Sequence, residues 1–90
     1  MSQASASRDE IRSAVREYIL AEFLPGEDPA ALTDSTPLIT GGILDSISSV
    51  RLISYLEERF GVRFEAREIT VDYLDTTDLI VATIQRKLEG

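Results

Sequence analysis

Neither cysteine nor histidine occurs among the 90 residues of the chain. Without cysteine, the protein forms no disulfide, binds no metal through thiolates and has no cysteine nucleophile. Without histidine, it lacks the most common general base, so a Ser-His-Asp triad cannot be assembled within this chain. Zinc bound by histidine is excluded for the same reason. These absences favour a protein that is not itself an enzyme.

Positive charge is also scarce, because nine Lys and Arg residues stand against 16 Asp and Glu residues, a net charge of −7. From Glu17 to Val50 there are six acidic residues and no basic one. Such a field repels nucleic acid and anionic membranes, so we expect neither as a partner. Proteins with basic patches are the favoured partners.

Long apolar segments are missing as well. No run approaches the ~20 apolar residues of a membrane-spanning helix, and Met1 to Ser7 has no apolar segment of the kind found in signal peptides. We therefore expect a cytoplasmic protein. The length suits one small domain, which we place at residues 7–90 after a disordered leader at residues 1–6, and we expect a monomer.

Apolar residues recur at helical spacing in three stretches. The first predicted helix covers residues 7–24, where Ser7 and Glu10 have the spacing of a capping box. The second covers residues 46–60 and ends before Gly61, and the last begins at Thr76 or Thr77. The residues expected to face the core are Ile11, Val15, Tyr18, Ile19, Phe23, Leu52, Ile53, Leu56, Phe60, Tyr73, Leu74, Ile80, Ile84 and Leu88.

Residues 65–70 are expected to form a short helix of one or two turns, with Ile69 pointing inward. The fold class is therefore all-α: a four-helix bundle with three main helices and one short helix. A long loop, residues 25–45, joins the first two helices and is punctuated by proline and glycine. We expect this loop to be ordered, because its apolar residues can anchor it: Leu32, Leu38, Ile39, Ile43 and Leu44.

The segment Gly41-Gly42-Ile43-Leu44-Asp45-Ser46-Ile47 is the most informative part of the sequence. Two glycines allow a tight backbone path, and Ser46 is then expected to be the N-cap residue of the second helix. A helix N-terminus favours a phosphate group, so the Ser46 hydroxyl is a candidate for covalent phosphate attachment. Asp45 could help to hold a Mg²⁺ ion used by a modifying enzyme. A plain N-cap serine remains the alternative interpretation.

A second set of residues on the same helix faces away from the predicted core: Ile47, Val50, Arg51 and Ser54. Two interpretations are open for the apolar members. Ile47 and Val50 either contact a partner protein or pack under the long loop.

Residues 8–88 resemble acyl carrier proteins and peptidyl carrier proteins. The resemblance is carried by the glycine-serine segment above and by three further segments: Asp34-Ser35-Thr36-Pro37-Leu38, Leu56-Glu57-Glu58-Arg59-Phe60-Gly61-Val62 and Leu74-Asp75-Thr76. It implies that a separate, Mg²⁺-dependent phosphopantetheinyl transferase attaches 4'-phosphopantetheine from coenzyme A to Ser46. The terminal thiol of this arm would then carry an acyl, aminoacyl or peptidyl group as a thioester. The implied partners are this transferase, a loading enzyme and downstream transferases.

The resemblance also assigns residue roles and shows one departure. Asp45 matches the residue that assists transferase recognition and metal placement, and Ile47, Val50, Arg51 and Ser54 match the partner-reading face. Carriers of fatty acid synthesis usually have a strongly acidic second helix, whereas the charges of residues 46–60 sum to zero here. We therefore expect nonribosomal-peptide or polyketide biosynthesis, as in antibiotic pathways, before fatty acid synthesis.

Other functions are weaker. An unmodified acidic helical adaptor would use the negative loop alone. A hydrolase using Ser46 has no histidine to support it. Asp72, Asp75 and Asp78 lack the pattern of a calcium loop, and we interpret them as acids at helix starts. The charged residues of the first helix are expected to form a solvated face with weak ion pairs, namely Asp9, Glu10, Arg12, Arg16 and Glu17.

Overall fold

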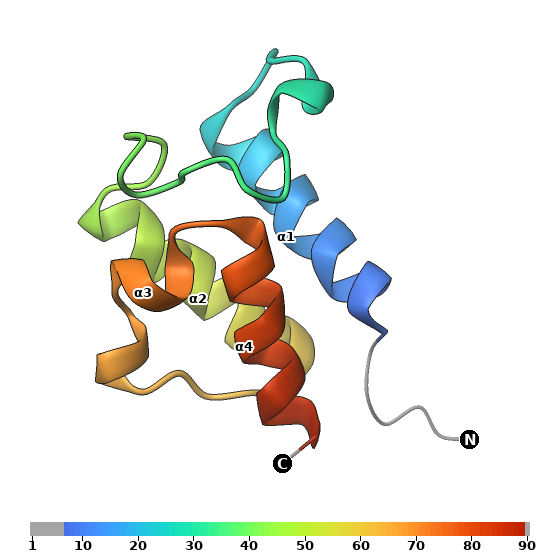
Figure 1. The fold of residues 1–90 in the computed structure, drawn as a ribbon, viewed down its shortest axis with the longest axis vertical. Coiled ribbons are helices and arrows are strands. Elements are labelled where there is room, and N and C mark those ends of the chain that lie inside the picture. Colours follow the sequence, from blue (N-terminus) through green and yellow to red (C-terminus); the bar gives the residue numbers. More distant parts are fainter. Residues whose placement is uncertain (1–6, 90) are drawn as a thin grey trace.

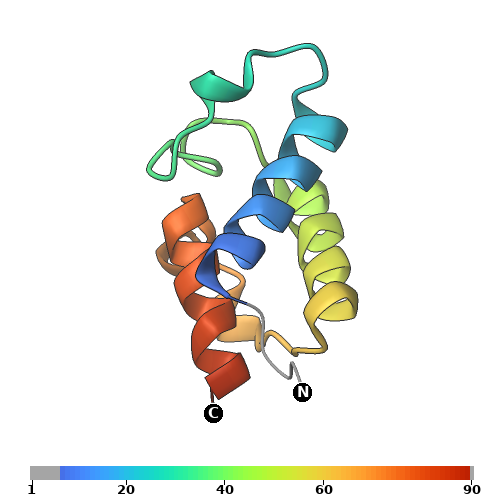
Figure 2. The same cartoon turned by 90° about the vertical axis from the view of Figure 1, so that its right-hand side faces the viewer.

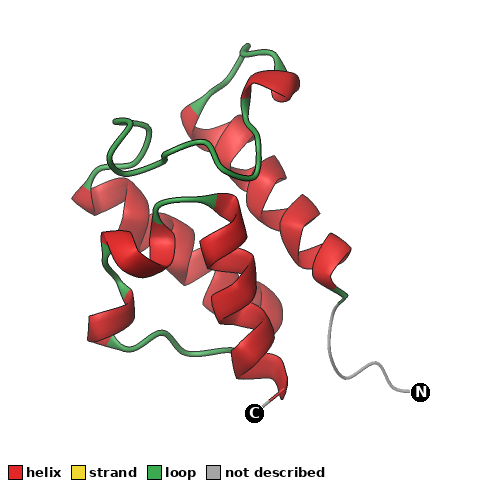
Figure 3. Cartoon of the chain, in the orientation of Figure 1, coloured by secondary structure: helices red, strands yellow, loops and turns green. Residues whose placement is uncertain are grey.

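The computed structural model describes residues 7–89, and all regular structure within them is helical (Figures 1 and 3). The four α-helices and two 3₁₀ turns are, in chain order, α1 (Arg8–Phe23), η1 (Pro29–Ala31), α2 (Ser46–Phe60), η2 (Ala66–Glu68), α3 (Val71–Leu74) and α4 (Thr77–Glu89). This confirms the predicted all-α fold with three main helices, one short helix and a long first loop. The predicted leader, residues 1–6, lies outside the described residues.

Helix α1 begins as the sequence predicts. The Ser7 hydroxyl accepts a hydrogen bond from the Glu10 backbone N–H at 3.2 Å, and the Ser7 N–H donates to Glu10 Oε1 at 2.9 Å. Both halves of the capping box are therefore present. The stripe of Ile11, Val15 and Ile19 is fully buried. It lies against α4 and α2, between which α1 runs in Figure 2.

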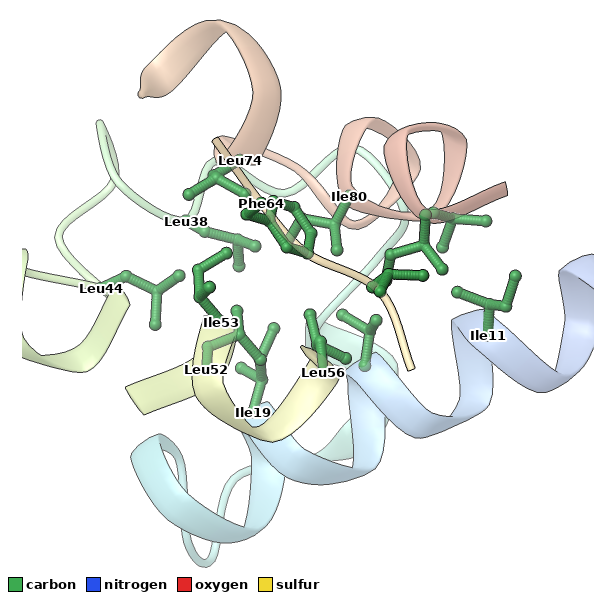
Figure 4. Close-up of a cluster of buried hydrophobic side chains, with 14 of the residues drawn as sticks. Ile11, Ile19, Leu38, Leu44, Leu52, Ile53, Leu56, Phe64, Leu74 and Ile80 are labelled. Carbon is green, nitrogen blue, oxygen red and sulfur yellow. The ribbon is translucent and has the colours of Figure 1, made fainter. Parts of the chain in front are cut away.

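The core joins side chains from all four α-helices and from the long loop (Figure 4). Leu52, Ile53 and Leu56 of α2 are buried, as predicted. The loop contributes Leu38 and Leu44, which lie between α2 and Leu74 in Figure 4. Of the predicted loop anchors, Leu32, Leu38 and Leu44 are buried, and Ile39 and Ile43 are partly buried, so the loop is part of the folded domain. The predicted core residues that are only partly buried are Tyr18, Phe23, Phe60, Tyr73 and Leu88.

The segment after α2 corrects one expectation. Residues 65–70 contain one helical turn, the 3₁₀ turn η2, as predicted, and a short α-helix follows at Val71–Leu74. Ile69 is 38% exposed, whereas Glu68 is buried. Glu68 Oε1 lies 2.6 Å from Lys87 Nζ and also accepts from the Glu65 N–H. An acid with two such partners can take an interior position, and this pairing across the fold is not visible from local periodicity.

Arginine side chains of α1 hold the long loop. Arg16 donates to the backbone oxygens of Leu32 and Pro29, so its assignment to a solvated face is wrong. The loop carbonyls gain charged donors that the sequence pattern did not reveal. The weak pair between Asp9 and Arg12 is present, as expected.

Within residues 7–89, none of the helices combines the length and the hydrophobicity that crossing a membrane requires.

Candidate attachment site

The segment before α2 folds into a small closed loop. The Leu44 N–H donates to the Leu38 backbone oxygen at 2.8 Å, and the Gly42 N–H donates to that of Ile39 at 3.1 Å. Gly42 has φ 85°, a conformation that disfavours side chains. Gly41 is needed for space, because an added Cβ would lie 2.3 Å from the Pro37 backbone oxygen. The tight backbone path predicted for this segment therefore requires Gly42 for its positive φ and Gly41 for lack of space.

The N-cap residue of α2 is Asp45, and Ser46 is the first residue of the helix. The expectation that Ser46 caps the helix is therefore wrong. Asp45 Oδ1 accepts from the Ser48 N–H at 2.8 Å. This hydrogen bond, followed by one with the Ser48 side chain, lowers the pKa of Asp45 below its ordinary value. Aspartate and serine are similarly good N-caps, so their order in the sequence could not decide between them.

Because Asp45 makes the capping hydrogen bond, the Ser46 hydroxyl is not used to cap the helix. Ser46 is exposed, and its hydroxyl makes no hydrogen bond with another described residue. The other serines of the first turn differ, because Ser48 is partly buried and Ser49 is only 7% exposed. The positive end of the 15-residue helix lies at Ser46. The geometry therefore presents one accessible hydroxyl where a phosphate group is favoured.

A groove of about 490 Å³ opens beside Ser46. We call it the attachment groove, and its lining residues are Ile39, Asp45, Ser46, Ser49, Val50, Ile69, Thr70, Val71 and Leu74. The loop supplies one wall, α2 the second, and the segment leading into α3 the third. Mainly apolar walls beside a free hydroxyl fit a flexible arm with a short chain attached. The residues present therefore fit a phosphopantetheine group on Ser46.

The structure places Ile47, Val50, Arg51 and Ser54, the residues predicted to contact partners, on the exposed side of α2. Ile47 is 73% exposed and Val50 55% exposed, so the alternative that they pack under the loop is wrong. Arg51 Nη2 lies 3.2 Å from Glu22 Oε1, and its guanidinium lies 5.7 Å from the centre of the Phe23 ring. These two residues of α1 thus hold the guanidinium group of Arg51 in place.

Sequence reasoning missed the role of Asp75. Asp72 and Asp78 lie in the first turns of α3 and α4, as expected, but Asp75 follows α3. Its carboxylate accepts hydrogen bonds from the backbone of Ile39 and Thr40, 36 and 35 residues away. The backbone hydrogen bond from Thr40 is the main cause that lowers the pKa of Asp75. Only the fold brings these residues together, so no local signal could have identified the contact.

A sequence model of the family described as "phosphopantetheine attachment site" matches residues 13–84. The chain belongs to this family. Its members carry a 4'-phosphopantetheine prosthetic group, so the protein is a phosphopantetheine-binding carrier. Membership implies interaction with a phosphopantetheinyl transferase and with acyl-handling enzymes in general. Carrier domains of this kind are typically non-catalytic.

The carrier should lose stability in acid. Hydrogen bonds lower the pKa of Asp45, Asp75 and Glu68, the last chiefly through the Glu65 N–H and then Lys87. A lowered pKa in the folded state stabilises the fold above the unfolded carboxyl values of about 4, and this contribution is lost as the pH falls through them toward the folded values. We expect the Tm to be steady near neutral pH and to fall below about pH 4.5. Calorimetry across this range checks it, and a Tm unchanged down to pH 3 would contradict it.

Proposed function

We propose that Ser46 bears the phosphopantetheine arm, and that this carrier presents an aminoacyl, peptidyl or polyketide-type acyl group to enzymes of a biosynthetic pathway. One observation carries the site assignment. The exposed Ser46 hydroxyl is free of the capping bond, stands at the N-terminus of α2 and borders the attachment groove. When bound, the arm supplies a thiol that forms thioesters, which a chain without cysteine cannot supply itself.

In the proposed attachment step, coenzyme A donates the phosphopantetheinyl group. The Ser46 Oγ forms a bond to the phosphorus that bears pantetheine, and the pyrophosphate bond to this phosphorus breaks. Adenosine 3',5'-bisphosphate leaves, and the hydroxyl proton passes to a base of the transferase. This chain contributes the nucleophilic oxygen and the positive end of α2 beside the incoming phosphate.

Asp45 is proposed to assist the transferase. Its Oδ1 is occupied by the cap, at 2.8 Å from the Ser48 nitrogen, which fixes the carboxylate next to Ser46. Carboxylate oxygens suit Mg²⁺, and an aspartate is charged at neutral pH. The second oxygen, Oδ2, would be the one to contact a metal ion brought by the transferase.

The pathway assignment depends on the charge of α2. Arg51 and Arg59 balance Glu57 and Glu58, so the helix carries no net charge. Enzymes that read an acidic helix through basic patches should bind such a surface less well. We therefore rank the cargo as aminoacyl or peptidyl first, a polyketide-type acyl group second and a fatty acyl group third.

The unmodified adaptor considered from the sequence has less support, because the chain belongs to the phosphopantetheine-attachment family. The observation in its favour is the acidic stretch from Glu17 to Val50, which contains no basic residue. Such an adaptor would bind a basic partner through the long loop. Its binding would not depend on the Ser46 hydroxyl, which distinguishes it from a carrier.

The decisive experiment is intact mass spectrometry after incubation with coenzyme A, Mg²⁺ and a broad-specificity phosphopantetheinyl transferase. We expect a gain of one phosphopantetheinyl group, mapped to the peptide that contains Ser46. A panel of aminoacyl-, polyketide- and fatty-acyl-loading enzymes then identifies the cargo. A folded sample, verified by circular dichroism, that gains no mass would overturn the proposal and favour the adaptor.

Reversing the charge of Arg51 should change partner choice. Arg51→Glu is expected to lower kcat/KM of the cognate loading enzyme by up to about fivefold, since an exposed ion pair contributes up to about 1 kcal/mol. Loading by fatty-acid enzymes should improve. The matched control is Arg59→Glu, an equal charge change at another exposed position of α2. Equal loading rates for the parent and Arg51→Glu with both enzyme sets would remove Arg51 from the specificity.

A further inference from the structure

We propose that Asp75 is a positioning residue that sets the loop wall of the attachment groove, and thereby shelters a group tethered at Ser46. This inference rests on the proposed function. Asp75 makes four hydrogen bonds to three consecutive loop residues. Its backbone oxygen accepts from the Leu38 N–H at 2.6 Å, and Oδ1 accepts from the N–H groups of Ile39 and Thr40 at 2.8 and 2.9 Å. Oδ2 accepts from the Thr40 hydroxyl at 2.9 Å.

These contacts join two walls of the same groove. Ile39 lines the groove from the loop, and Val71 and Leu74 line it from α3. Asp75 follows Leu74 directly, so its position moves with α3. Its carboxylate holds the backbone of Ile39, 36 residues earlier in the chain. One side chain therefore fixes the spacing between walls that come from separate parts of the sequence.

The wall that bears Ser46 is held independently. Asp45 caps α2 through Ser48, and Leu52 and Leu56 bury the helix in the core. Asp75 makes no hydrogen bond to α2 within the described residues. Removing its carboxylate should free the loop wall and leave the attachment hydroxyl in place. Removal of the Asp75 carboxylate should therefore leave attachment of the arm at Ser46 unchanged and reduce the shelter of the tethered group. A general loss of stability would affect both.

Two variants and a control test this. Asp75→Ala removes the carboxylate, whereas Asp75→Asn retains an oxygen that can accept from the two loop N–H groups. The matched control is Asp72→Ala, which makes the same charge change at an exposed position of α3. Each protein is loaded with a pantetheine arm that ends in a polarity-sensitive fluorophore, and intact mass confirms loading. The readouts are amide hydrogen exchange at Ile39 and Thr40 and quenching of the fluorophore by neutral acrylamide.

We expect Asp75→Ala to load at the parent rate, to exchange the two amides at least about fivefold faster, and to expose the fluorophore to acrylamide as in the free arm. Asp75→Asn should restore much of the protection, and Asp72→Ala should match the parent. If Asp75→Ala does not fold, Thr40→Val serves, because it removes only the Oδ2 contact; partial loss of protection and shelter is then expected.

Three results would overturn the proposal. The first is faster exchange with unchanged quenching, which would make the contact purely structural. The second is an equal effect of Asp72→Ala, which would assign the change to charge. The third is a parent fluorophore quenched like the free arm, which would show that the tethered group stays outside the groove while Ser46 is still loaded. Failure of the parent to gain the arm at all would instead overturn the function proposed for Ser46, and this inference with it.

Discussion

Replacing Ser46 by alanine is expected to abolish attachment of phosphopantetheine and to leave the fold intact. The substitution removes the oxygen that would form the bond to phosphorus. It does not remove the helix cap, because Asp45 supplies this through its bond to the Ser48 nitrogen. Alanine is also a good helix former. The free energy of unfolding should therefore change by no more than about 0.5 kcal/mol. Intact mass and urea titration measure the two effects on one sample.

Neighbouring serines provide the controls. Ser48→Ala and Ser49→Ala also remove a hydroxyl from the first turns of α2, yet both variants should gain the arm as the parent does. Ser49 is only 7% exposed, so its hydroxyl is much less accessible to a transferase than that of the exposed Ser46. A mass gain in Ser46→Ala would show that another hydroxyl carries the arm. Loss of the gain in all three variants would indicate damage to transferase docking.

The sequence was sufficient for features that depend on neighbours along the chain. Helical periodicity located α1, α2 and α4 because each buries a regular apolar stripe. Turn chemistry located the loop and the glycines before Ser46. Ser46 was singled out partly by its place at a helix start, where the sequence wrongly made it the N-cap residue, and partly by the resemblance to carrier proteins.

Features that depend on distant contacts were misjudged. Glu68 takes the inward position assigned to Ile69, because Lys87 lies 2.6 Å away across the fold. Arg16 was assigned to solvent but binds loop carbonyls 13 and 16 residues away. In both cases a charged side chain gains partners that periodicity does not register.

The same limit applies to the walls of the attachment groove. Its α2 wall follows from local sequence, whereas its loop wall is held by Asp75 from beyond α3. Asp75 lies after α3, far from Ser46 in the sequence, and can still shape the surroundings of the Ser46 hydroxyl. The proposed attachment point is thus encoded locally, whereas only the complete fold creates the groove beside it.

Gly41→Ala is expected to give the largest loss of stability among the loop substitutions. The added Cβ would stand 2.3 Å from the Pro37 backbone oxygen, far inside van der Waals contact. The obstacle is backbone, so the closed loop from Leu38 to Leu44 must shift to relieve the contact. Forcing extra volume into a packed site typically costs about 1–3 kcal/mol. Because the cap by Asp45 holds the start of α2 independently of this loop, the transferase should load the variant at a rate near that of the parent. Urea unfolding and the kcat/KM of loading are the measurements.

Gly42→Ala is the informative comparison, because the two glycines are adjacent but constrained differently. At Gly42 no atom lies within 4 Å of an added Cβ, and the positive φ of 85° is the only constraint. The backbone conformation alone should cost about 1 kcal/mol, with little displacement of the loop and a loading efficiency near that of the parent. If the free energy of unfolding of Gly41→Ala lies within about 0.5 kcal/mol of that of the parent, the loop accommodates the added Cβ easily. The path from Pro37 to Leu44 would then not be rigid enough to act as a fixed wall of the attachment groove.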